Sequence, residues 1–263
     1  MNHKGGWALI KSSWLSWMQY RSFFFILAFG WMIPPLIYML VWSGAAGAGS
    51  LGGLTSQEFI AYYLLLILVN QLTYSQTNWT VGDVIRMGSI NHWLLRPMPP
   101  LYNPLASEVA GKVVTMVFVL PISSVLALVL HPELHTSWDR VGLALLALAF
   151  AWLLRFFWGY WLALLAFWTT RADALLALQD SLVFLLAGVV APVWMLPAGL
   201  KAAANGLPFR FMVGFPIEVL MGQVSGQALF IGFGVQTLWA AAAVIISTIV
   251  WWLGLRRYAA IGG

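Results

Sequence analysis

The sequence contains no cysteine, so it forms no disulfide and offers no thiolate to a metal ion. Charged residues are also scarce, at 8% of the 263 residues, whereas soluble domains carry about a quarter. So few charges cannot cover a globular surface. Hydrophobic residues make up 62% of the chain, and they gather in runs near or above the ~20 residues that cross a bilayer. The composition therefore predicts a membrane protein with several spans.

Motifs for nucleotide binding and hydrolysis are also missing. The sequence has no G-x-x-x-x-G-K-[ST], no H-E-x-x-H and no G-x-S-x-G. We therefore expect a chain that is not itself an enzyme, although an intramembrane enzyme using Asp180 and Glu108 is an alternative. His131 and His135 share one loop without a nearby carboxylate triad, so we expect no metal site. The net charge of +5 comes from short loops beside apolar runs, which favours membrane orientation over nucleic-acid binding.

Six apolar segments are predicted to be transmembrane helices in a single all-α domain over residues 1–263. They are Ser22–Ala46, Glu58–Trp79, Leu105–Leu130, Val141–Trp168, Leu175–Leu196 and Ala228–Leu253. We expect the first to bend at Pro34-Pro35, where two backbone donors are lost. Ahead of it, residues 1–21 place Trp7, Ile10 and Trp14 at helical spacing, which predicts a helix lying along the membrane surface.

Residues 197–227 are apolar but interrupted. Pro208 and Pro216 stand among several glycines, so neither fragment reaches spanning length. We predict two short helices that enter one leaflet and return, a re-entrant pair before the last span.

The basic residues test the orientation of these segments. If the amino terminus is cytoplasmic, that side also holds most of the Lys and Arg residues: Lys4, Lys11, Arg21, Arg86, Arg96, Arg171, Arg256 and Arg257. The outer side then holds Arg140, Lys201 and Arg210. This asymmetry predicts six spans with both termini in the cytoplasm.

The loop at residues 80–104 would then be cytoplasmic. Gly88 can end the preceding helix, Ser89 can cap a new one and Pro97 stops it. Ile90, Trp93 and Leu94 share a face of this short helix. Such a helix fits a groove on a soluble partner, and it equally fits the headgroup layer as an anchor.

Polar residues inside the spans are further candidates. Asn70, Gln71 and Tyr74 contribute to one face of the second span, which lines a transport path or forms hydrogen bonds between helices. Arg155 and Asp180 lie within later spans, where charges are costly and therefore functional candidates. They differ in depth by roughly 9 Å at 1.5 Å rise per residue, so direct pairing stays open.

Glu108 and Lys112 have the i,i+4 spacing of a helical ion pair. We interpret this pair as a tie between helices rather than as a proton relay.

The sequence resembles type-2 permeases of ATP-binding-cassette exporters in three stretches that occur in the same order. These are Ile85–Pro97, Ala187–Pro197 with its following prolines, and the tail Gly254–Tyr258 with Gly262-Gly263. The resemblance covers most of the chain and is closest to six-span permeases of about 260 residues. It implies an amino-terminal elbow helix, a cytoplasmic coupling helix and an outer re-entrant pair. It departs from the family at Asn91, where an acidic residue is usual.

The resemblance also implies partners and a function. Two permeases, identical or homologous, would pair in a bacterial cytoplasmic membrane above two ATPase subunits, which hold the ATP and Mg²⁺ while this chain binds no cofactor. The cargo would be a drug-like or other amphiphile; an assembly or scaffold protein is the alternative. The resemblance assigns ATPase coupling to Ile85, Arg86, Gly88, Ile90, Asn91, His92, Trp93, Leu94, Arg96 and Pro97.

Overall fold

The computed structural model describes residues 3–258, so Gly262-Gly263 of the predicted tail lie outside the described residues. Helices dominate residues 3–258, and a small antiparallel hairpin joins two strands of two residues each. The helices are α1 (His3–Gln19), α2 (Arg21–Ala46), α3 (Ser56–Thr73), α4 (Thr77–Arg86), α5 (Asn91–Leu94), α6 (Tyr102–Leu130), α7 (Trp138–Leu164), α8 (Ala172–Leu186), α9 (Ala198–Gly206), α10 (Phe209–Leu220) and α11 (Gly226–Arg257). The strands are β1 (Ser50–Leu51) and β2 (Leu54–Thr55), and the 3₁₀ turns are η1 (Leu165–Phe167) and η2 (Val193–Met195).

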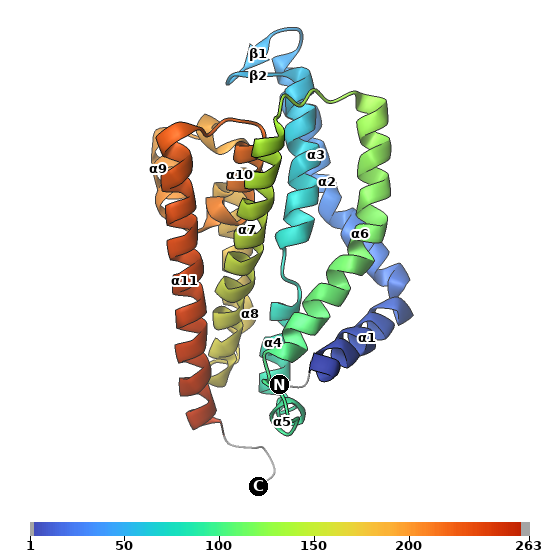
Figure 1. Cartoon of the computed structure of the whole chain (residues 1–263), viewed down its shortest axis with the longest axis vertical. Helices are drawn as coiled ribbons and strands as arrows, with labels where there is room; N and C mark the ends of the chain where they lie inside the picture. Colours follow the sequence, from blue (N-terminus) through green and yellow to red (C-terminus); the bar gives the residue numbers. More distant parts are fainter. Residues whose placement is uncertain (1–2, 259–263) are drawn as a thin grey trace.

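Within residues 3–258, four helices are long and apolar enough to cross a bilayer. They are the Phe25–Ala46 part of α2, α6, α7 with η1, and α11. α2 continues through Pro34-Pro35 without ending. α6 contains Pro121 and changes direction along its length (Figure 1), as expected where a proline removes a backbone hydrogen bond. The described chain is therefore mainly helical, with four helices long and apolar enough to span, which is consistent with an all-α membrane protein.

The predicted second span is not one helix. α3 ends at Thr73, Tyr74 adopts an extended conformation with φ −59° and ψ 131°, and α4 begins at Thr77. α3 alone has 18 residues, which is about 27 Å against a hydrocarbon core of about 30 Å. The prediction of a continuous helix over Glu58–Trp79 was wrong because the Lys112 side chain of α6 binds the Tyr74 carbonyl at this break, 38 residues away in the sequence.

The predicted fifth span is also shorter than expected. α8 ends at Leu186 after 15 residues, and Gly188 then takes a φ of 88°, which favours glycine. The backbone carbonyls beyond the helix find donors in other elements. Tyr62 donates its hydroxyl hydrogen to the Gly188 carbonyl at 2.8 Å, and Trp42 and Tyr63 donate to the Val190 carbonyl at 2.7 and 3.0 Å. The helix therefore stops before the predicted Leu196.

Residues 197–227 form two short helices, α9 and α10, as their prolines predict. Most of α10 is buried, including Phe211, Met212, Phe215 and Ile217, so it packs inside the protein and lipid does not surround it. Figure 1 places α9 and α10 at the end of the molecule opposite α5. The beginning of α1 and the end of α11 lie at the α5 end (Figure 1). The loop that contains α5, the beginning of α1 and the end of α11 thus lie at the same end of the molecule.

Candidate functional site

The loop between α4 and α6 reverses the chain at Gly88, whose φ is 71°. The amide groups close the turn: Gly88 donates to the Ile85 carbonyl at 3.1 Å, and Ile90 donates to the Val84 carbonyl at 3.1 Å. The predicted cap is not formed. The Ser89 hydroxyl donates back to the Val84 carbonyl at 3.2 Å, and Ile90 occupies the position before α5. The helix that follows has only four residues.

The predicted contact residues divide between the interior and the surface. Ile85 and Ile90 are 4% and 0% exposed and lie in one buried cluster with Tyr160 of α7. They anchor the loop and present no face to a partner. The half-buried members are Gly88, Asn91 and Trp93, and the exposed members are Arg86, His92, Leu94, Arg96 and Pro97.

Two exposed apolar side chains extend this surface beyond the predicted set. Met87 is 77% exposed and Leu95 is 83% exposed. We call the exposed side chains of Arg86, Met87, His92, Leu94, Leu95 and Arg96 the loop face. Leu95 follows Ile90 by five residues, which places it on nearly the opposite side of a helical turn. Because Ile90 points inward, Leu95 points outward, so an apolar and basic surface remains exposed.

Three tethers join the loop to other helices. Arg86 forms an ion pair with Asp83, donates to the Thr170 carbonyl at 2.6 Å and lies 3.6 Å from Asp173 at the start of α8. The hydrogen bond to Asp83 raises the Arg86 pKa above its ordinary value. Arg96 donates to the Asn103 side chain of α6 at 2.6 Å.

The third tether comes from the end of α11. The Tyr258 hydroxyl donates to the Gly88 carbonyl at 3.1 Å. The loop is therefore connected to α6, α8 and α11, and a displacement of the loop would move these helices or break the hydrogen bonds that join them to it.

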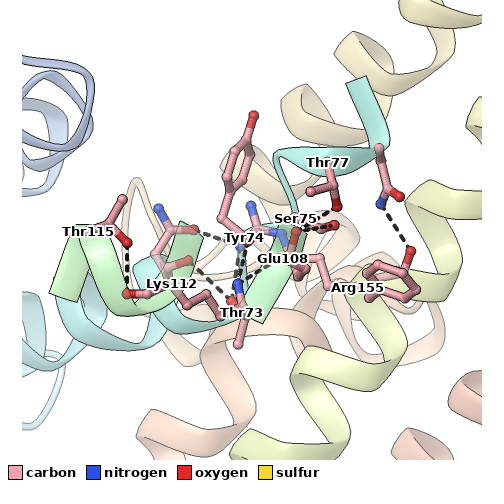
Figure 2. A network of polar contacts seen from close by, with 11 residues as sticks. Thr73, Tyr74, Ser75, Thr77, Glu108, Lys112, Thr115 and Arg155 are labelled. Carbon is pink, nitrogen blue, oxygen red and sulfur yellow. Dashed lines mark hydrogen bonds and ion pairs between the residues drawn. The ribbon is translucent and has the colours of Figure 1, made fainter. Parts of the chain in front are cut away.

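The break between α3 and α4 is held by an ion pair from α6 (Figure 2). Lys112 donates to the Tyr74 carbonyl at 2.7 Å and lies 2.7 Å from the Glu108 carboxylate. That carboxylate accepts hydrogen bonds from the hydroxyls of Ser75 at 3.2 Å and Thr77 at 2.7 Å. Glu108 is 3% exposed. Its charge is compensated where it lies, and the pair is a tie between helices, as the sequence indicated.

Arg155 approaches the same break from α7 (Figure 2). Its guanidinium donates to the Asn70 side chain at 2.7 Å and to the Thr73 hydroxyl at 3.1 Å, and it lies 5.0 Å from the centre of the Tyr74 ring. The Tyr74 hydroxyl in turn donates to Asp180 at 3.4 Å. Within the described residues no ion pair joins Arg155 to Asp180; Tyr74 connects them instead.

Most of these side chains line one cavity of about 230 Å³ between α2, α3, α7 and α8. Its walls are the residues Trp31, Pro34, Pro35, Asn70, Tyr74, Arg155, Asp180, Val183, Phe184 and Val189. Gln71 does not line it; this buried side chain lies in a separate space of about 20 Å³ beside Trp17 and Lys112. That space holds a water molecule at most. The structure thus brings together all the predicted intramembrane residues except Gln71.

A model of the family described as ABC-2 family transporter protein matches residues 30–262. The chain belongs to this family. No curated protein matches it. Together with the long apolar helices, membership identifies a multi-pass membrane protein of permease type.

For an ABC-2 permease, the structure adds residues that the sequence did not single out. Trp31 and Phe184 complete the cavity, and Met87 and Leu95 enlarge the loop face. The exposure of Leu95 follows once Ile90 is known to be buried. No local pattern marks Trp31 or Phe184, because apolar aromatic residues are abundant throughout the chain.

Proposed function

We propose that this ABC-2 permease is the membrane subunit of an exporter whose ATPase is a separate chain. Two permeases, identical or homologous, would pair in a bacterial cytoplasmic membrane above two ATPase subunits that bind ATP and Mg²⁺. The cargo is an amphiphilic or hydrophobic molecule moved out of the cytoplasm. The observation that carries this proposal is the loop face, an exposed apolar and basic surface at one end of a family member otherwise made of apolar helices.

In this proposal the chain crosses the membrane six times. The crossings are α2, α3 continued by α4, α6, α7, α8 and α11. α1 is the elbow helix along the cytoplasmic surface, α5 is the coupling helix, and α9 with α10 is the outer re-entrant pair. The burial of α10 inside the protein supports this, because a helix too short to span ends in non-helical backbone, which at membrane depth is tolerated only where protein covers it.

The tethers provide a route by which a displacement of the loop would change the walls of the cavity. Arg86 connects the loop to the start of α8, which carries Asp180 on the cavity wall. The break at Tyr74 separates α4 from α3, and the Tyr74 side chain also lines the cavity. A displacement of α4 by the ATPase would therefore act on two cavity walls. Coupling between the loop and the cavity needs an element that can adopt two distinct conformations, and the break at Tyr74 is the candidate for that element.

The test compares two leucine substitutions at opposite ends of the molecule. Leu95→Asp places a charge in the loop face, whereas Leu134→Asp changes an exposed leucine in the loop between α6 and α7. Tagged permease is purified from membranes, and the co-purifying ATPase is measured by its ATP hydrolysis. We expect Leu95→Asp to lose most of the ATPase and Leu134→Asp to retain it. A wild-type permease that brings down no ATPase, or equal recovery with both variants, would refute the proposal.

A further inference from the structure

The cavity between α2, α3, α7 and α8 carries one positive and one negative side chain that do not pair directly. Arg155 is 3% exposed, and its Nε atom has no hydrogen-bond partner among the described residues. Among the described residues, Asp180 accepts long hydrogen bonds from Tyr74 at 3.4 Å and from Gln179 at 3.3 Å. Separated opposite charges in apolar surroundings are costly unless each is paired. The cavity therefore presents two charges of opposite sign, on α7 and α8, that form no ion pair with each other among the described residues.

Besides these charges, the wall carries three aromatic side chains, together with Pro34, Pro35, Asn70, Val183 and Val189. Trp31 and Tyr74 meet edge to face with ring centres 4.3 Å apart, and Phe184 lies on the α8 side. Aromatic faces next to a carboxylate are suited to an ammonium group, because a cation is attracted by the ring electrons. A guanidinium is suited to phosphate or carboxylate, which it binds through two parallel hydrogen bonds. The two halves of the cavity thus favour opposite ends of a dipolar group.

The size and position of the cavity limit the ligand further. A volume of about 230 Å³ is below the roughly 300–1,000 Å³ of sites that enclose a whole drug-sized molecule. The Pro34 and Phe184 side chains on its wall are exposed, so the cavity reaches the surface between α2 and α8. Exposed apolar residues follow these wall residues along the same helices, Ile37 on α2 at 53% and Leu185 on α8 at 49% exposure. A polar head fits inside while an apolar tail remains outside.

We propose that this cavity binds the head group of a zwitterionic amphiphile. The anionic group lies at Arg155, whose guanidinium already faces the Tyr74 ring; the ammonium lies at Asp180 beside Trp31 and Phe184, and the tail extends between α2 and α8. This inference rests on the proposed export function, for which it names the class of cargo.

The test measures lipid retention by native mass spectrometry of the purified permease in maltoside micelles. Four lipids with identical acyl chains are offered: phosphatidylcholine, anionic phosphatidylglycerol, cationic O-ethylphosphatidylcholine and neutral diacylglycerol. We expect phosphatidylcholine to be retained roughly tenfold more tightly than the others. Asp180→Asn removes the negative charge, so the preference should shift toward phosphatidylglycerol. Asp139→Asn, an exposed acid at the start of α7 outside the cavity, is the control and should keep the wild-type order.

Two results would overturn the proposal: similar retention of all four lipids by the wild type, or an unchanged order in Asp180→Asn. Free phosphocholine is a third arm. If it displaces the lipid as well as an intact phosphatidylcholine does, the site takes a soluble zwitterion and the amphiphile is wrong. No ATPase is present in this assay, so a failure here is distinct from a failure of the loop to bind an ATPase.

Discussion

Two interruptions of helical structure are stabilised by different chemistry. At Tyr74–Gln76 the backbone and its neighbouring hydroxyls are bound by a charged pair, Glu108 and Lys112. After Leu186 the free carbonyls are bound by neutral donors from Trp42, Tyr62 and Tyr63. Both places lie among buried apolar side chains, where a backbone group without a hydrogen bond costs about 1–3 kcal/mol because no water replaces its partner.

We call the contacts of Glu108 and Lys112 the charged tie, and the hydrogen bonds from Trp42, Tyr62 and Tyr63 the neutral tie. The contacts of the charged tie depend on one another, whereas the hydrogen bonds of the neutral tie are independent. Removing one partner of a buried ion pair strongly destabilises a protein, because the remaining charge is left without compensation. Neutral hydrogen bonds each contribute modestly, and the loss of one leaves the others in place. The charged tie lies where α4 and the loop join the rest of the protein, and the neutral tie holds the segment that leads to α9 and α10.

The largest effect is expected for Lys112→Met. It leaves Glu108 buried without its cation and removes the donor from the Tyr74 carbonyl, a loss of about 3–5 kcal/mol for a broken buried pair. Unfolding in mixed micelles of maltoside and dodecyl sulfate, followed by tryptophan fluorescence, measures the change. The double variant Glu108→Gln with Lys112→Met is the control and should be more stable than Lys112→Met alone. Equal or lower stability of the double variant would show that charge compensation is not what Lys112 provides.

An intermediate effect is expected for Tyr62→Phe. The Gly188 carbonyl loses the donor at 2.8 Å and remains buried, which costs about 1–3 kcal/mol. Tyr63→Phe is a matched control, because the Val190 carbonyl keeps the Trp42 donor at 2.7 Å. The same unfolding assay should rank Tyr62→Phe clearly below Tyr63→Phe in stability. If Tyr63→Phe were the less stable variant, the Gly188 carbonyl would not depend on Tyr62 alone and the Val190 carbonyl would not be held by Trp42, contrary to what the distances indicate.

The two interruptions also show what sequence patterns can and cannot predict. Gly188 and Pro192 are recognisable signals for the end of a helix, so the early end of α8 was accessible from local sequence. The break at Tyr74 was not. Asn70 and Tyr74 have the spacing of a continuous helical face, and the donor that stabilises the break, Lys112, is 38 residues away. Nothing in the local sequence reports that contact.

The loop shows the same division between local and distant information. Its position, its glycine turn and its mixture of apolar and basic residues followed from the sequence. Which apolar residues face outward did not, because that depends on the packing of Ile85 and Ile90 against α7. The amphipathic pattern was consistent with either assignment of the inner face. The tertiary contact selected Ile90 for the interior and left Leu95 exposed.

The smallest effect is expected for Ser75→Ala, and it tests whether the charged tie depends on its weaker contacts. Glu108 loses one hydroxyl donor at 3.2 Å but keeps Thr77 and Lys112, each at 2.7 Å. The cost should be about 0.5–1.5 kcal/mol, the ordinary value of one hydrogen bond, in the same unfolding assay. Combined with Lys112→Met, the substitution should cost a different amount than it does alone, since residues in one network couple. If the two losses of unfolding free energy simply add, the carboxylate and its donors act independently. The contrast between a coupled charged tie and an uncoupled neutral tie would then be wrong.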